Sequence, residues 1–306
     1  LWDWGSPIDG RADNAASDTR NPSINANGPV FGVSQMNDAL NMIDPIEHKA
    51  TIIKVPTKAP PLVSGFNAAP NPSPYWGEDM WKRLGDPRSV GIDAKGRVWV
   101  TVRIRDAKQQ PAWCSGPGAN KFGKNYPTTT SGKQVAVYDP KTQKFEYVDT
   151  CFNVDHNEFS HDNFIYYGTT GSLGWINMDT WDKTHDAEAS QGWCPAVVDT
   201  NGDGKVTEWT EPDAPIDPRK DRRITFGCYP ITVNPKDGSV WCSGIGNDQR
   251  RLVRIEKGPN PPETCKAEVY EPPRAGQMPD LIGTGGVTSD HNGVVWQGWR
   301  VSGHFT

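Results

Sequence analysis

The chain lacks several features that would place it in a common class. It has no run of 18 consecutive apolar residues, so no stretch is long enough to span a membrane. It has no surplus of positive charge, since its formal net charge at pH 7 is −5. This argues against a basic nucleic-acid-binding surface. No CxxC pair, P-loop, GxSxG or HExxH motif occurs. Zinc ribbons, phosphate-cradling loops and the familiar hydrolase signatures are therefore not indicated.

Turn-forming residues, aromatics and cysteines are present instead. The 306 residues include 31 glycines, 27 prolines and 13 tryptophans, a composition typical of all-β proteins with many tight turns. The six cysteines are an even number, which favours disulfides and an oxidising, periplasmic or extracellular compartment. Buried free thiols in a cytosolic protein are the alternative.

One pattern recurs along the sequence. An apolar stretch is followed by a short turn ending in glycine, one further residue, and then valine with an aromatic. Such segments are 21–32, 86–100, 228–242 and 283–297, with a weaker copy at 162–177. Each segment predicts two antiparallel strands joined by a tight turn, and a second predicted hairpin follows in the complete units.

Four strands in meander order, repeated radially, are the blades of a β-propeller. We therefore predict an all-β fold with about five visible blades in a single domain over 1–306. The predicted units lie near 21–56, 86–150, 161–213, 228–272 and 283–306. The last unit has only its first hairpin, so we expect further blades or domains in a longer parent chain.

The repeat resembles that of the virginiamycin B (streptogramin) lyase family, and it is similar to NHL and SMP-30-like propellers. The likeness rests on a Pro-x-x-apolar-x-x-x-x-Gly-x-Val-Trp pattern followed by a strand ending in Tyr-Asp-Pro. The resemblance implies elimination chemistry on the central face, with a magnesium ion and a histidine base. Blades of that family often begin with Pro-His-Gly, and here only His161-Asp162 puts a histidine near a predicted blade start.

Residues at the predicted blade starts are the candidate site, because they would line the central channel. His161 beside Asp162 is a candidate general base, and Arg88 a candidate carboxylate clamp. Asp86, His161 and Asp162 are an alternative ligand set for a divalent cation. Arg20, Asn21 and Tyr229 are predicted to bind substrate. The competing interpretation is that these residues cap strands around a water-filled channel.

The tryptophans divide into two predicted groups. Those at the repeat position are expected to pack between blades, together with Phe31: they are Trp99, Trp175, Trp241 and Trp296. Tryptophans outside the repeat, Trp76 and Trp113 among them, are candidate platforms for a glycan. The long insertions 57–85, 106–133 and 179–192 are all expected at one end of the blades, which marks the predicted working face.

A calcium-loop pattern begins at Asp199. Asp199, Asn201 and Asp203 supply oxygen ligands at positions 1, 3 and 5, and Lys205 would add its carbonyl. Glu208 and Glu211 lie near the position of the final carboxylate. The loop is expected in the turn between the third and fourth strands of a blade, where calcium would be structural. An ion-free Asn-Gly and Asp-Gly turn is the alternative.

The cysteines can pair in many ways, and we favour pairing within a repeat unit. This predicts Cys114 with Cys151 and Cys242 with Cys265, which leaves Cys194 with Cys228.

These observations predict an exported propeller with metal-assisted lyase or hydrolase activity on a polar small molecule. The alternative is a non-catalytic module that binds a glycan or a protein, or serves as a scaffold in a larger secreted protein. The same fold hosts all of these functions.

Overall fold

The computed structural model describes residues 12–17, 28–35, 38–61, 84–169, 171–244, 251–271 and 284–299. The chain divides into two compact units. The first comprises Leu1–Gln110 and Thr130–Asn153, and the second comprises Pro111–Thr129 and Val154–Thr306. The single domain predicted over 1–306 stays a prediction. Among the described residues, no helix is both long and apolar enough to cross a membrane.

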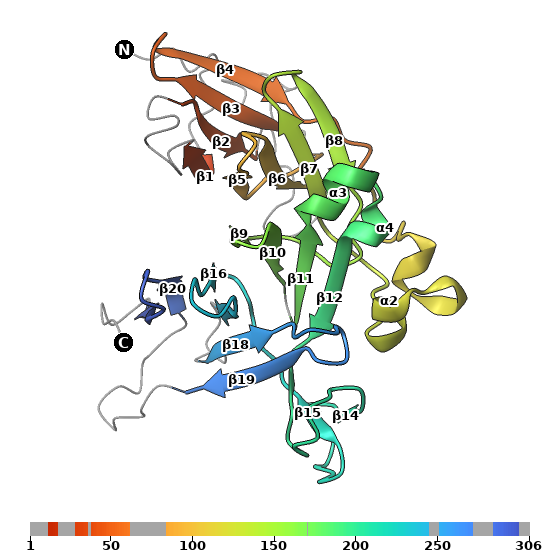
Figure 1. Cartoon of the computed structure of the whole chain (residues 1–306). Helices are drawn as coiled ribbons and strands as arrows, with labels where there is room; N and C mark the ends of the chain where they lie inside the picture. The colour runs from red at the N-terminus through yellow and green to blue at the C-terminus, as the bar shows by residue number, and fades with distance from the viewer. Residues whose placement is uncertain are drawn as a thin grey trace, which may run out of the picture. The chain divides into compact units, whose positions relative to one another are not determined.

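The first unit holds two four-stranded antiparallel meanders, which are β-propeller blades (Figure 1). Strands β1 (Ala12–Ser17), β2 (Val30–Ser34), β3 (Ala39–Asp44) and β4 (Lys49–Lys54) form the first blade. Strands β5 (Val90–Ile92), β6 (Val98–Val102), β7 (Gln134–Asp139) and β8 (Lys144–Val148) form the second. The first strand of the first blade therefore lies before residue 21, where the predicted unit began.

The β5–β6 hairpin shows how the repeat builds a blade. Asp93 accepts hydrogen bonds from the backbone of Lys95 and Arg97 at 2.9 Å each, which closes the turn. Gly96 has a φ of +84°, which L-residues adopt only with strain. Trp99 follows on β6, fully buried, and its indole N–H donates to the Asp93 carboxylate at 2.9 Å.

The repeat aromatics are core residues in most blades. Phe31, Trp99 and Trp175 are buried, which confirms the prediction, while Trp241 is half-buried. Trp296 is 46% exposed, so the prediction is wrong there. Trp296 lies on β21 (Val295–Trp299), which pairs with β20 (Thr284–Ser289) in a two-stranded sheet with no third strand among the described residues.

The second unit contains two complete blades (Figure 1). The third blade is β9 (Asn157–Phe159), β10 (Phe164–Gly168), β11 (Ser172–Asn177) and β12 (Gln191–Pro195). The fourth is β16 (Ile231–Val233), β17 (Val240–Ser243), β18 (Leu252–Glu256) and β19 (Lys266–Tyr270). A separate three-stranded sheet holds β13 (Val197–Val198), β14 (Trp209–Thr210) and β15 (Asp221–Arg223).

The third blade corrects the predicted strand order. The 162–177 copy of the repeat was expected to supply the first and second strands, but it forms the second and third, β10 and β11. The short strand β9 precedes them, so the blade covers 157–195 instead of 161–213. A three-residue strand carries too little hydrophobic periodicity to stand out in a sequence. The Asp199 loop therefore lies outside the blade.

Helices occupy two of the insertions. Residues 106–133 contain two 3₁₀ turns, η1 (Ala112–Cys114) and η2 (Gly116–Gly118), and the helix α2 (Lys121–Asn125). Helices α3 (Met178–Thr184) and α4 (Ala187–Ser190) connect β11 to β12. They join the third strand of the blade to the fourth, whereas this insertion was predicted between the second and third strands. It therefore lies at the end of the blade opposite to the predicted end.

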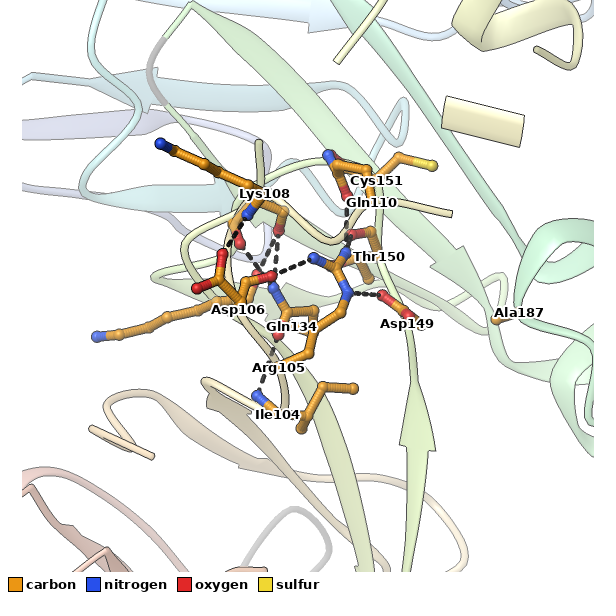
Figure 2. Close-up of polar contacts among 12 residues, drawn as sticks. Ile104, Arg105, Asp106, Lys108, Gln110, Gln134, Asp149, Thr150, Cys151 and Ala187 are labelled. Carbon is orange, nitrogen blue, oxygen red and sulfur yellow. Dashed lines mark hydrogen bonds and ion pairs between the residues drawn. The ribbon is translucent and has the colours of Figure 1, made fainter. Parts of the chain in front are cut away.

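Arg105 fixes the start of the 106–133 insertion to the end of the second blade (Figure 2). Its guanidinium donates to the Asp149 carboxylate at 2.7 Å, to the Gln110 amide oxygen at 2.7 Å and to the Thr150 carbonyl at 3.2 Å. Gln110 in turn donates to the Cys151 carbonyl at 2.8 Å. Because these guanidinium N–H groups bind neighbouring parts of the fold, Arg105 has a positioning role.

Candidate functional site at the start of the inner strands

The residue two positions before the first strand has the same backbone pairing in two blades. The Arg88 N–H donates to the Thr101 carbonyl at 2.9 Å, and the Tyr229 N–H donates to the Ser243 carbonyl at 2.9 Å. Both residues therefore stand at a blade start, as predicted. The first strand of a propeller blade is the innermost, so the blade starts are the natural place for ligand-binding side chains.

His161 and Asp162 do not lie at a blade start, contrary to the prediction. They belong to the turn between β9 and β10, because the third blade begins one strand earlier than expected, and both are exposed. The Asp162 carboxylate lies 3.6 Å from the Lys257 ammonium and also accepts a short hydrogen bond from the Ser160 hydroxyl. The catalytic role predicted for the pair stays a prediction.

His156 takes the place at the start of the third blade. Its carbonyl accepts a hydrogen bond from the Gly168 N–H at 3.1 Å, which extends the β9–β10 ladder by one residue. The His156 ring meets the Tyr229 ring edge to face, with their centroids 4.1 Å apart. Two blade starts of neighbouring blades are therefore in direct contact, and both side chains are half-buried.

Glu158 lies two residues beyond His156 on β9, so the two side chains share a face of the strand. It is paired with Tyr166 on β10, and directly opposed residues of an antiparallel pair also share a face. That face is turned toward the fourth blade, where Lys257 follows β18. The Lys257 ammonium lies 3.2 Å from the centroid of the Phe164 ring and 5.7 Å from the centroid of the Tyr166 ring.

Burial alone raises the pKa of the Glu158 carboxyl, to about 7. No neighbouring charge contributes to this shift. None of the described residues forms a hydrogen bond or an ion pair with the Glu158 carboxyl. Side chains in this condition are costly to stability and concentrate at functional sites. The sequence did not identify His156 or Glu158 as site residues, because their position at the start of the third blade depends on the short strand β9.

Arg88 belongs to the first unit, in a charged surrounding. The neighbouring Asp86 is buried and its carboxylate lies 2.9 Å from the Lys133 ammonium. Asp38 accepts hydrogen bonds from the backbone of Leu84 at 2.7 Å and Gly85 at 2.9 Å. Asp86 is thus held in an ion pair, and it is not part of a three-ligand metal cluster among the described residues.

Three carboxylates gather where calcium was predicted. Oxygens of Asp199, Asp203 and Asp221 lie within 4.8 Å of one another. Asp221 stands at the start of β15, is buried, and was not identifiable from the loop pattern because it is 18 residues beyond Asp203 in the sequence. Burial, and then the charges of Asp199 and Asp203, raise the pKa of the Asp221 carboxyl. A divalent cation would relieve this repulsion.

The remaining residues of the predicted calcium loop have other contacts. Backbone N–H groups of Gly202 and Gly204 donate to Asp199 at 2.9 and 3.1 Å, while Asn201 accepts from the Asp203 N–H at 2.9 Å and Asp203 from the Lys205 N–H at 2.8 Å. Glu208 lies 3.4 Å from the Lys220 ammonium, and Glu211 pairs with Arg223. The two glutamates are not among the clustered carboxylates.

All six cysteines are disulfide-bonded, and none is free. Cys194 pairs with Cys265, and Cys228 pairs with Cys242, so the predicted Cys194–Cys228 and Cys242–Cys265 pairs are wrong. Cys228 precedes β16 and Cys242 lies on β17, so their disulfide joins the two strands of one hairpin. Cys194 lies on β12, and its disulfide to Cys265 reaches the neighbouring blade. Disulfides of this number indicate an oxidising, extracytoplasmic location.

The other predicted ligand-binding residues give a mixed result. Arg20, Asn21 and Trp76 lie outside the described residues. Trp113 is half-buried in η1, and its indole nitrogen is buried with no hydrogen-bond partner among the described residues. The glycan-binding role predicted for Trp113 stays a prediction.

Comparisons with known proteins give the fold context. No family model matches the chain, and no curated protein matches it. Virginiamycin B lyase from Staphylococcus aureus is 11% identical over 98% of this chain and 71% of that chain, with a TM-score of 0.49. A streptogramin B lyase is 12% identical over 98% of this chain and 83% of that chain, with a TM-score of 0.40.

A surface protein of the type-IX secretion system, PorZ from Porphyromonas gingivalis, is 10% identical. The match covers 94% of this chain and 31% of that chain, with a TM-score of 0.49. Likeness of this size carries no argument about activity. The blades themselves show that the chain is a β-propeller protein.

Proposed function

We propose that this chain is a periplasmic or extracellular β-propeller that binds a polar small molecule at the starts of β9 and β16 and acts on it as a lyase or hydrolase. The contact between His156 and Tyr229 carries the proposal, because it joins two blade starts into one surface. An imidazole is suited to proton transfer near neutral pH, and a phenol can donate a hydrogen bond to an oxygen of the ligand.

A calcium ion at Asp199, Asp203 and Asp221 is the proposed cofactor, with a structural role. Three clustered carboxylates, one of them buried, supply the oxygen ligands that calcium prefers. Asp221 starts β15 of the three-stranded sheet, and Asp199 and Asp203 lie in the loop that follows β13. The cluster is therefore outside the blades, and the proposal assigns it no step of the reaction. Metal assistance by a second cation at Asp86, His161 and Asp162 has no support from the described residues.

The alternative function is a non-catalytic binding or scaffold module. It would leave His156 and Tyr229 as packing residues at a blade boundary. A ligand screen observed by NMR separates the two. The protein is labelled in its histidine and tyrosine rings and titrated with panels of esters, lactones and polar lyase substrates.

We expect ligands that shift the His156 and Tyr229 ring signals and leave His161, in its exposed turn, unchanged. His156→Gln and Tyr229→Phe should weaken those ligands, while His161→Gln should not. If responses gather at His161 instead, the site is wrong. If no panel member shifts either ring and none is turned over, the scaffold alternative replaces the proposal.

A further inference from the structure

Glu158 is a half-buried carboxyl that the fold leaves without an opposite charge. On the facing blade, the Lys257 ammonium has other partners: it pairs with Asp162 at 3.6 Å and lies over the Phe164 ring. Since burial is the only cause of the shifted pKa of Glu158, the Lys257 charge does not reach it. A protein that buries a carboxylate ordinarily supplies a partner.

The neighbours of Glu158 are aromatic. Tyr166 stands directly opposite Glu158 on β10, and the rings of His156 and Tyr229 meet at the start of β9. Faces of aromatic rings attract cations, and a carboxylate supplies a charge-assisted hydrogen bond to an N–H donor. Together these groups have the chemistry of an ammonium-binding site. Tyr166 is buried, whereas Glu158, His156 and Tyr229 are half-buried, so a ligand can reach the carboxyl and these two rings.

We infer that the Glu158 carboxylate binds the ammonium group of the ligand, so that the site takes an amine-bearing small molecule. The inference rests on the proposed function, because it names the ligand class of the same site. A divalent cation is less well suited, since Glu158 belongs to no cluster of three ligating side chains among the described residues.

Isothermal titration with matched probes tests the inference on the whole disulfide-bonded chain. Benzylammonium and benzyl alcohol share a ring and differ in charge. At pH 8 we expect benzylammonium to bind at least about tenfold more tightly than benzyl alcohol. Glu158→Gln, which keeps the shape of the side chain, should abolish that difference. Glu188→Gln on α4, an exposed glutamate of the same unit, is the control that should preserve it.

Acid pH provides the second readout. The titratable groups around Glu158 are Asp155 and His156 on its own strand segment, Tyr166 and Asp162 from the β9–β10 hairpin, and Tyr229 and Lys257 from the fourth blade. Below about pH 7, protonation of Glu158 should weaken benzylammonium binding by up to about tenfold per pH unit. The decline should persist in His156→Gln and vanish in Glu158→Gln.

Four outcomes would overturn the inference: no benzylammonium binding, equal affinity for both probes, an unchanged preference in Glu158→Gln, or displacement of the amine by calcium at the same site. Equal affinity accompanied by shifts at His156 and Tyr229 would leave the proposed function standing while rejecting the amine. Failure of the proposed function alone would appear as amine binding with no turnover of any amine-bearing ester or lactone.

Discussion

The rings of His156 and Tyr229 meet edge to face, with centroids 4.1 Å apart, across the boundary between the third and fourth blades. Edge-to-face contacts of this kind contribute about 0.5–1.5 kcal/mol beyond area burial. The same boundary brings Gly168 against Cys228 and places Glu158 opposite Tyr166. The same residues therefore pack the two blades together and form the proposed site. A substitution there should change both the stability of the protein and its affinity for a ligand.

Glu158→Gln should stabilise the protein at alkaline pH. The folded-state pKa of about 7 is above the ordinary 4.5, so the native chain loses stability as the pH rises from about 4.5 to about 7. The variant removes that loss. At pH 8 we expect it to be more stable than the wild type by up to about 3 kcal/mol, with the difference shrinking toward zero at pH 4.5. Urea unfolding across this pH range measures it. A variant that is equally stable at pH 8 would show that the carboxyl has a partner.

Calcium should raise the melting temperature, because an ion that binds only the folded chain stabilises it by mass action. Asp221→Asn and Asp203→Asn should remove most of the rise, since each deletes one ligand charge from a cluster within 4.8 Å. Asp213→Asn, an exposed change in the same segment, is the control. Calorimetric titration that shows neither heat nor a melting shift at saturating calcium would eliminate the site.

Gly168→Ala should destabilise the boundary between the third and fourth blades. A Cβ atom at Gly168 would lie 2.0 Å from the Cys228 carbonyl oxygen, and backbone cannot give way as a flexible side chain can. We expect a loss of about 2 kcal/mol or more in unfolding free energy. Gly286→Ala, where a Cβ meets nothing within 4 Å, should change it by less than about 0.5 kcal/mol. Equal effects of the two variants would contradict this packing.

The Cys194–Cys265 and Cys228–Cys242 disulfides of the second unit should contribute different amounts to the free energy of unfolding. Cys194–Cys265 closes 71 residues and Cys228–Cys242 closes 14. In the chain-entropy account, replacing the first pair by serines costs about 4 kcal/mol and the second about 3 kcal/mol. Denaturant unfolding of the two double variants measures the difference. Peptide mapping without reduction checks the pairing, and a Cys194–Cys228 peptide would refute it.

The blade architecture could be predicted from sequence because each hairpin repeats the same local chemistry. Trp99 follows an Asp-x-Lys-Gly turn and Trp241 an Asp-Gly turn, and both occupy the second strand as expected. The third blade could not be predicted, because its Trp175 lies on the third strand and the repeat alone does not reveal a preceding strand of three residues.

The candidate site depended on that missed strand. A shift of one strand moves His161 from a blade start to the turn between β9 and β10, and puts His156 at the blade start. Tyr229 was predicted correctly as a blade-start residue because the fourth blade keeps the regular repeat. Asp221 joins Asp199 only through the β13–β15 pairing, a long-range contact that no local motif encodes.

The most direct test of the account is the pKa of the Glu158 carboxyl, measured by carbon-detected NMR in the folded protein with Glu158→Gln to assign the signal. The account predicts a midpoint near 7, because the carboxyl is buried without a charged partner. A midpoint near 4.5, the ordinary value for glutamate, would contradict it, because a compensated carboxylate has no need of a cationic ligand.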